Sequence, residues 1–523
     1  MPTARCGTED MAMRIRLFLL LSLSLFAPAL LAQTAWSPGG WPTLHQDAGN
    51  RRSVDVSVLG RQYHTWQALH GATVLTAPTT SPDGRQLYVT TGQGAGHSNL
   101  HAYSLQGELL WRAQPWRGAD DSVDPCALLS SPIVDRDGDI YLGDCNQLFA
   151  FRPDGALKWV IDLPPVQAED WQPVAGHPIN ALTTAAFTAA GDILGVTNFG
   201  DVIVVDRASG RVRNQPYRLP GLIPPYSTLV PMPDSVFGDG MMDPRFREWA
   251  WQLIFGGNMR SANTPAVARD GRLFVVGSGD TAGIGALYGL DLVSVDGVLH
   301  VQEAFATAIG LGSGSSPALS PDERQVYVSD EDGWLYAVDA RSGAVDWKVQ
   351  TRATAGAAGV GADGTVYALQ ANAPAVVAVS PGGELLWQSD LGEQLARWPS
   401  SWLLGDAVAV GNGNPSITAD AILVPVYYGY PVPLPGVDFR LPVHSAVVAL
   451  DKASGRALVD VVRLPDDSSG ITAVLPGGAI VSSLGGVMTS ALGPLKRVAD
   501  WVLPGEMTMI EATGGIQVAL PRE

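Results

Sequence analysis

One recurring pattern spans almost the whole chain, and it constrains the fold more than any other feature of the sequence. Each copy has two short apolar runs joined by an Asp-Gly or Pro-Asp turn, followed by a second pair of runs joined by a Gly-containing turn. Clear copies occupy 77–111, 130–159, 315–347 and 357–387, and weaker copies occupy 181–214, 263–301, 413–459 and about 470–502. Eight four-stranded units, repeated about every 40–50 residues, predict an all-β chain folded as an eight-bladed β-propeller of antiparallel blades.

The composition agrees with this prediction and excludes some classes of protein. The 523 residues include 59 Gly and 38 Pro, as expected for many short strands joined by tight turns. Hydrophobic residues make up 46% and charged residues 16%, which excludes a disordered chain. The formal net charge of -18 argues against nucleic acid as a partner, because phosphate backbones would be repelled.

The N-terminal residues read as an export signal. Arg14 and Arg16 precede an apolar run, and Ala32 offers a small residue for cleavage, so residues 1–32 are predicted to be a signal peptide with an over-long start. A buried N-terminal helix is the alternative. Residues 33–523 would then form one propeller, periplasmic or secreted, with no transmembrane segment after cleavage. No Cys stands at the cleavage point directly after the apolar run, so the lipid anchor of a bacterial lipoprotein is not expected.

Two cysteines, Cys126 and Cys145, follow the predicted cleavage point. A hairpin turning at 136–138 would pair Asp135 with Asp139 and place Cys145 opposite position 129, three residues from Cys126. In an oxidising compartment this spacing predicts a structural disulfide worth about 3 kcal/mol. The DRDGD run at 135–139 also has the carboxylate spacing of a calcium loop, but we interpret it as an ordinary hairpin turn.

The four clear copies end in the pattern A-x-D-x-x-x-G-x-x-x-W or a close variant of it. The copy with Ala337, Asp339, Gly343 and Trp347 matches it in full. Copies with one residue fewer before the Gly end at Trp111, Trp159 and Trp387. This pattern resembles the PQQ-like, quinoprotein-type propeller repeat over about 41–508. The resemblance implies that each Trp docks against the neighbouring blade.

The start of the mature chain carries two further expectations. Residues 41–54, WPTLHQDAGNRRSV, resemble the opening segment of the same family. Residues 63–70 resemble a lone fourth strand. We expect that strand to complete the last blade and so remove the open edge of the ring.

Antiparallel alternation places the second-to-third loops and the blade-to-blade loops on one face, here called the long-loop face. These loops are long, whereas the turns on the opposite, short-turn face are uniformly short. We expect the long-loop face to carry function. Its long segments are 92–99, 115–129, 164–180, 216–262, 391–412 and 427–445.

The largest insertion on the long-loop face is 217–262, and it contains a predicted helix. A lid packed over the axis is the first interpretation of this insertion. An apolar partner surface using Trp249 and Trp251, or contact with a membrane, are the alternatives.

Charged and histidine side chains on the long-loop face form the candidate binding face. The acidic residues could be a solvated rim, a cation site or the surface for a basic partner, and the histidines could be isolated surface residues or could converge at the axis. The candidates are His97, Asp120, Asp121, Asp124, His177, Arg260, Asp330, Asp332 and His444, with Trp249 and Trp251.

Sequence features of known enzyme sites are missing. The chain has no adjacent Cys pair, no CxxCH, no GxSxG and no HExxH, so no catalytic, metal or cofactor residue is assigned, and PQQ with calcium is only an open alternative. The sequence is similar to the propeller subunit of the outer-membrane β-barrel assembly machinery, although it lacks the lipidated Cys and has larger loops. This similarity implies a monomeric, non-enzymatic binding or assembly scaffold for a protein partner or an envelope polymer. The alternative is an enzyme with a site at the channel mouth, either a divergent PQQ-dependent dehydrogenase or a lyase or hydrolase of envelope polymers.

Overall fold

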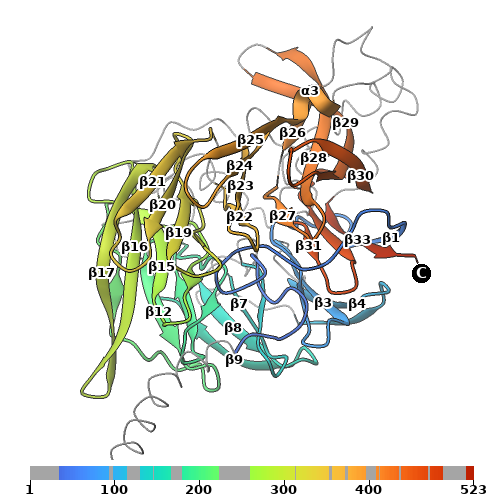
Figure 1. Cartoon of the computed structure of the whole chain (residues 1–523). Coiled ribbons are helices and arrows are strands. Elements are labelled where there is room, and N and C mark those ends of the chain that lie inside the picture. The colour runs from blue at the N-terminus through green and yellow to red at the C-terminus, as the bar shows by residue number, and fades with distance from the viewer. Residues whose placement is uncertain are drawn as a thin grey trace, which may run out of the picture.

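The eight predicted blades form a closed ring (Figure 1). The computed structural model describes residues 35–92, 98–114, 130–144, 146–166, 179–222, 259–312, 314–352, 356–370, 375–395, 408–411, 413–434, 437–468, 471–486 and 514–522. Every strand pairing within a blade is antiparallel. In the described part of the chain no helix is long and apolar enough to cross a bilayer.

The strands of the first four blades run outward from the axis in chain order. Blade 1 has β2 (Thr79–Thr80), β3 (Gln86–Thr90), β4 (Leu100–Ser104) and β5 (Leu109–Arg112). Blade 2 has β6 (Ile133–Val134), β7 (Ile140–Gly143), β8 (Gln147–Phe151) and β9 (Leu157–Asp162). Blade 3 has β10 (Ala186–Phe187), β11 (Ile193–Val196), β12 (Asp201–Val205) and β13 (Tyr217–Arg218). Blade 4 has β14 (Ala266–Val267), β15 (Leu273–Ser278), β16 (Ile284–Val295) and β17 (Val298–Leu311).

Blades 5 to 8 follow the same plan, with additions in blade 7. Blade 5 has β18 (Ala318–Leu319), β19 (Gln325–Ser329), β20 (Trp334–Asp339) and β21 (Val345–Gln350). Blade 6 has β22 (Gly359–Val360), β23 (Val366–Gln370), β24 (Ala375–Val379) and β25 (Leu385–Asp390), followed by helix α3 (Leu391–Leu395). Blade 7 has β27 (Ser416–Ile417), β28 (Ile422–Leu434), β29 (Val437–Leu450) and β30 (Ala457–Leu464), and β26 (Val408–Gly411) pairs with β28. Blade 8 has β31 (Ala473–Val474), β32 (Ile480–Leu484), β33 (Gly515–Pro521) and β1 (Tyr63–Ala68).

Blade 8 joins the two ends of the described chain, as the 63–70 segment predicts. β1 pairs with β33 in continuous register from Tyr63 opposite Pro521 to Ala68 opposite Ile516. The prediction that the eighth copy ends near 502 is wrong, because its third strand is β33. The strand lies beyond the predicted end because residues 485–514 separate β32 from β33.

Two predicted loops contain regular structure. The 427–445 segment is the extended part of the β28–β29 hairpin, with Tyr427 paired to Ser445, and 391–412 contains α3 and β26. On the short-turn face, the turn that joins β16 and β17 of blade 4 is short, as predicted. However, β16 and β17 stay paired from Asp291–Gln302 out to Val295–Val298, so a hairpin projects beyond the blade.

Aromatic rows within the blades explain the repeat pattern. In blade 5, Tyr327 pairs with Ala337, and Ala337 pairs with Trp347 on the outer strand. The small Ala side chain lets the two aromatic rings meet across it, with centroids 5.8 Å apart. Tyr88 with Trp111, Tyr141 with Trp159, and Tyr367 with Trp387 repeat this contact in blades 1, 2 and 6.

The same indoles connect neighbouring blades. Trp347 Nε1 donates to the carbonyl oxygen of Pro381 in blade 6 at 2.9 Å, and its ring lies against Gly383, which has a φ of 86°. A Cβ built on Gly383 would lie 2.7 Å from Trp347 Cγ, so the glycine of the pattern is required for this contact. The indoles of Trp66, Trp111, Trp159 and Trp387 donate likewise to the next blade. The predicted packing role of these tryptophans is confirmed.

An N-terminal segment crosses the axis at the short-turn face (Figure 1, dark blue). Its backbone accepts hydrogen bonds from the N–H groups of innermost strands, including Val134 to Pro42, Val267 to Ala48 and Leu319 to Gly49. Trp41 and Arg52 are fully buried. The segment that resembles the opening of the propeller family therefore fills the axis at this level and contacts most of the blades.

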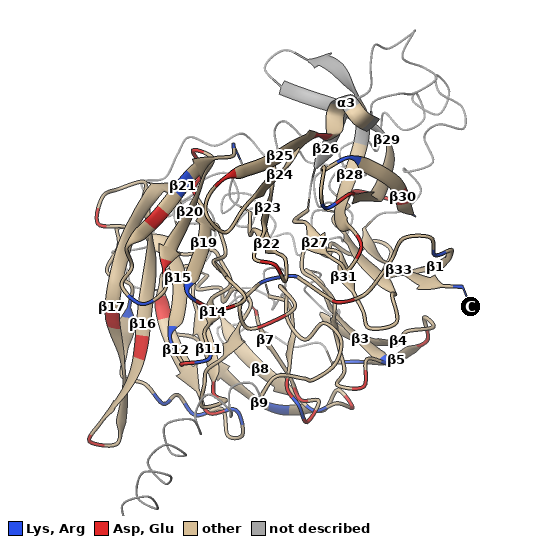
Figure 2. Cartoon of the chain, in the orientation of Figure 1, with Lys and Arg blue, Asp and Glu red and all other residues tan. Residues whose placement is uncertain are grey.

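Charged residues follow the layering of the ring. The innermost strands carry no Lys, Arg, Asp or Glu, whereas turns and outer strands carry many (Figure 2). Among the described residues, the charged groups carried by the blades themselves therefore lie on the two faces or the circumference.

A pair of glycine substitutions tests the indole contact. We expect Gly383→Ala to lower the free energy of unfolding by about 2–4 kcal/mol, because the new Cβ meets the Trp347 ring at positive φ. Gly84→Ala is the control, since Gly84 has a φ of 68° but nothing within 4 Å of its Cβ position. We expect the control to cost about 1 kcal/mol. Urea unfolding measures both, and equal losses would contradict the proposed role of the indole.

Candidate functional site

Hydroxyl side chains tie the blades together around the axis, at the starts of the innermost strands. The Ala77 N–H donates to Ser131 Oγ at 3.0 Å, and the Ser131 N–H donates to Thr184 Oγ1 at 3.0 Å. Further links are Thr183 to Asn263, Thr264 to Ser316, Ser315 to Gly356, Ser416 to Thr472 and Ser483 to Thr76. These polar groups are buried and paired, so they hold the ring together and are not free to bind a ligand.

Between blades 6 and 7 an arginine bridges the two innermost strands. Blade 6 starts with Ala357 and Ala358, which have no hydroxyl to donate. The buried guanidinium of Arg52 donates to the Ala357 carbonyl, and the Arg52 carbonyl accepts from Ile417 N–H in blade 7 at 2.8 Å. Arg52 thus stands in for the hydroxyl of the other blades and completes the inter-blade links at the axis.

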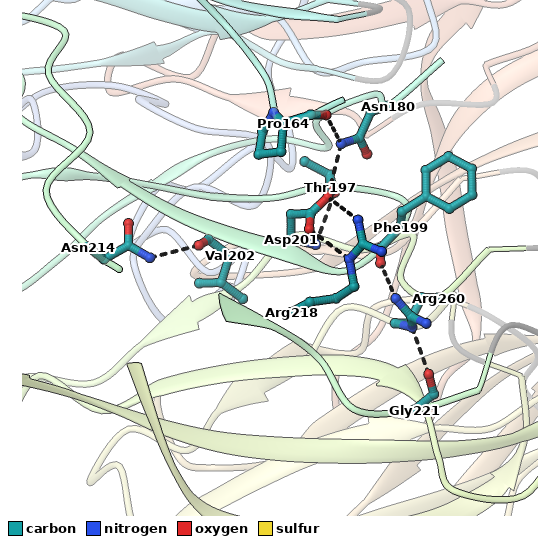
Figure 3. Close-up of polar contacts among 10 residues, drawn as sticks. All are labelled: Pro164, Asn180, Thr197, Phe199, Asp201, Val202, Asn214, Arg218, Gly221 and Arg260. Carbon is teal, nitrogen blue, oxygen red and sulfur yellow. Dashed lines mark hydrogen bonds and ion pairs between the residues drawn. The ribbon is translucent and has the colours of Figure 1, made fainter. Parts of the chain in front are cut away.

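A polar network supports the long-loop face at blade 3 (Figure 3). Arg218 donates from Nε to Asp201 Oδ1 at 2.8 Å and from Nη2 to Asp201 Oδ2 at 3.2 Å. Asn180 Nδ2 donates to Asp201 Oδ2 at 3.0 Å and to the Pro164 carbonyl at 2.6 Å. One buried carboxylate therefore joins the bases of the 164–180 loop and of the 217–262 insertion.

Arg260 belongs to the same framework. Its Nε donates to the Gly221 carbonyl at 2.6 Å and its Nη1 to the Phe199 carbonyl at 2.7 Å (Figure 3). These bonds hold the two ends of the insertion, at residues 221 and 260, against blade 3. Arg260, a candidate binding residue from the sequence, therefore fixes the base of the insertion.

Asp330 and Asp332 share the second-to-third turn of blade 5. Asp330 is buried, and its carboxylate accepts from Trp334 N–H at 2.8 Å and from Tyr336 Oη at 3.0 Å. Burial, with the bond to Asp330, raises the pKa of Tyr336 to about 12. Asp332 is exposed. Glu331 stands between these two residues in the chain. Its pKa is raised, first by desolvation and then by the negative charges of Asp330 and Asp332. Only the exposed part of this turn is available to a partner.

His444 is the described member of the predicted histidine set. It is 4% exposed in β29, and its Nε2 lies 3.2 Å from Asp460 Oδ2 in blade 7. The remaining candidates, His97, Asp120, Asp121, Asp124, His177, Trp249 and Trp251, lie outside the described residues, as do Cys126 and Cys145. The structure therefore does not test convergence of the histidines or the disulfide. The hairpin before Cys145 has the predicted register, with Ile133 opposite Tyr141.

The DRDGD run forms a hairpin turn, as interpreted from sequence. Asp135 Oδ1 accepts from the N–H groups of Asp137 and Asp139 at 2.9 Å, and Oδ2 accepts from Tyr141 Oη and from Arg207. No group of three or more His, Cys, Asp or Glu side chains in the described ranges is arranged to hold a metal ion.

Sequence reasoning missed the axial hydroxyl links and Arg52. A usable signal was present, because clear copies begin with paired Ser residues before Pro, as at 130–131 and 315–316. Blade 6 breaks that signal at 357–358, where Arg52 supplies the link.

The comparisons with known proteins agree with this architecture. A family model described as "Outer membrane protein assembly factor BamB" matches residues 242–397 and 297–424. A curated protein of Mycobacterium tuberculosis, named "Protein Rv3035", is 23% identical over 310 residues. That match spans 59% of this chain and 65% of the relative's own length.

Among solved structures, a europium-containing methanol dehydrogenase is similar with a TM-score of 0.56 at 13% identity. The match covers 94% of this chain and 99% of that one. The quinohemoprotein alcohol dehydrogenase ADHIIG of Pseudomonas putida HK5 has a TM-score of 0.51 at 12% identity, covering 95% and 81%. At these identities the two structures show the shared fold alone.

Removal of the Arg218 guanidinium tests the network at blade 3. We expect Arg218→Gln to lower the free energy of unfolding by about 2 kcal/mol, because Asp201 stays buried with a weakened set of donors. Arg324→Gln is the control, since the Arg324–Asp322 pair is 84% and 60% exposed and contributes little. Chemical denaturation compares the two, and a loss no larger than that of the control would refute a buried role for the pair.

His101 provides a test by pH. Burial, with the charge of Arg112 second, lowers its pKa from 6.5 to about 4. Below pH 6.5 His101 is protonated in the unfolded chain, whereas in the folded protein it stays neutral until the pH is near 4. The free energy of unfolding therefore falls as the pH drops from 6.5 toward 4, by up to about 3 kcal/mol. We expect His101→Gln to make this fall in stability between pH 6.5 and 4 smaller; the fully buried His45, whose pKa is also lowered by burial, remains in the variant and keeps part of the fall. The exposed His64→Gln should leave it unchanged, and an unchanged profile in the His101 variant would contradict this assignment.

Proposed function

The chain carries the PQQ-like propeller repeat, and on this premise we propose that it is a non-enzymatic binding or assembly scaffold, exported to the periplasm or outside the cell. Its long-loop face takes up a protein partner or an envelope polymer. Support comes from the family model of an outer membrane protein assembly factor, which matches 242–424 when its two matches are merged, and from the signal-like residues 1–32.

The observation that carries the proposal is how the described polar groups on the long-loop face are used. Asp201, Arg218 and Arg260 hold loop bases in place, and Asp330 holds its own turn. Charged groups that fix loop bases build a rigid platform, and a rigid scaffold that presents long loops is a common arrangement for binding. An acid–base catalyst would instead need such groups to reach a substrate.

Site-directed photocrosslinking in the native host tests this function. A photoreactive residue at Asp332, exposed on the long-loop face, should give one discrete adduct with a polypeptide or a polymer. The same residue at Asp154, exposed in a turn of the short-turn face, is the matched control and should give no such adduct.

Two results would contradict the scaffold. One is crosslinking that is equal at both positions or absent from both. The other is a small molecule that accompanies the mature protein in native mass spectrometry and is lost on denaturation, which would support an enzyme with a bound cofactor.

A further inference from the structure

A pocket of about 230 Å³ opens on the short-turn face, away from the loops on which the proposed function rests. It lies between the N-terminal segment and the first-strand ends and turns of blades 3, 4 and 5. Trp36, Phe187 and Val267 line it with apolar surface. The rings of Trp36 and Phe187 meet edge to face, with centroids 4.6 Å apart. We call this cavity the Trp36 pocket.

Two ion pairs stand at the Trp36 pocket. Arg51 Nε lies 2.6 Å from Asp47 Oδ2, and Arg269 Nε lies 3.2 Å from Glu323 Oε1. All four residues line the cavity. The pocket therefore combines an apolar, aromatic wall with donors and acceptors of both signs, which is how sites for small organic groups are usually built.

Two of the lining side chains also carry polar atoms without a hydrogen-bond partner. They are the indole Nε1 of Trp36, a donor, and Oε1 of Gln46, an acceptor. A buried polar atom left unpaired is costly, and few remain in folded proteins. The lining of one pocket thus offers both an unpaired donor and an unpaired acceptor, and an amide group, with its carbonyl and its N–H, could pair with each once these side chains turn toward the cavity.

A groove between blades 4 and 5 adjoins the Trp36 pocket. That groove, of about 690 Å³, shares Ala268, Arg269 and Glu323 with the pocket and extends past Arg272 to Arg341. A small free solute would need only the pocket. An adjoining groove provides room for the chain next to an anchoring residue, as in peptide recognition.

We propose that the Trp36 pocket binds an aromatic side chain of a polypeptide, with the adjoining main-chain amide held at the pocket and the peptide continuing along the groove of blades 4 and 5. The site is independent of the proposed function, because it uses the opposite face and none of the long loops.

Binding of small probes to the mature protein tests this proposal by NMR. We expect N-acetyl-L-tryptophanamide to bind with a dissociation constant in the millimolar range or below, and to shift the indole N–H resonance of Trp36. Trp36→Phe serves to assign that resonance. N-acetyl-L-alaninamide and indole, which lack the ring and the amide respectively, should each bind about tenfold more weakly.

Substitution at the pocket provides the second arm. Ala48 lines the cavity and is partly exposed, so Ala48→Phe should fill the space and abolish binding of the tryptophan amide. Ala156→Phe, at an exposed turn of the same face, is the matched control and should bind as the parent does. Circular dichroism and urea unfolding establish that both variants are folded.

Three outcomes would overturn the proposal. The first is equal binding of indole and the tryptophan amide, which would leave an aromatic cavity without a peptide site. The second is unchanged binding in a folded Ala48→Phe variant. The third, which holds even if that variant fails to fold, is saturation by the probe without movement of the Trp36 indole resonance.

Discussion

The contact between an indole and a glycine of the next blade is the interaction on which this ring depends. Each such Trp lies in the outer strand of one blade and donates its N–H to a carbonyl of the next; in blades 1, 2, 5 and 6 it also packs across an Ala onto a Tyr of its own blade. Burial of a large aromatic ring contributes a few kcal/mol, and the N–H bond fixes its direction. The blades are therefore held in order mainly by one recurring side chain, and in blade 4 the ring of Phe305 packs over Gly343 without the N–H bond.

At the axis the problem is different, because eight innermost strands end close together with unpaired backbone groups. Hydroxyl side chains satisfy some of these groups between neighbouring blades, and the N-terminal segment satisfies others. Arg52 does both, because its side chain donates to the Ala357 carbonyl and its own carbonyl accepts from the Ile417 N–H. The axis is thus a region of structural polar chemistry, and this explains why buried polar residues near it do not indicate a site.

Periodicity was enough to predict the fold, because strand, turn and Trp positions repeat with little variation. The Trp347 row, the closing strand at 63–68 and the turn at 135–139 were all predictable, since each depends on local spacing. The hydrogen-bond partners of the described candidate residues were not predictable. Arg260 and Asp330 lie on the predicted face, yet each is engaged by backbone groups that are distant or follow the turn, and no spacing rule reveals that. The hairpin at 427–445 was mistaken for a loop because its Pro and Gly residues are typical of turns.

The pairing of Tyr63 with Pro521 also has a kinetic consequence. Contacts between residues so far apart in a chain form slowly, and closing a loop of this length costs on the order of 5 kcal/mol of chain entropy before any pairing energy is gained. Seven blades can assemble from neighbouring segments, whereas the eighth needs both ends of the described chain. Ring closure is then the late, rate-limiting step of folding, and until it occurs the open strand edges of the unfinished blade are exposed to aggregation.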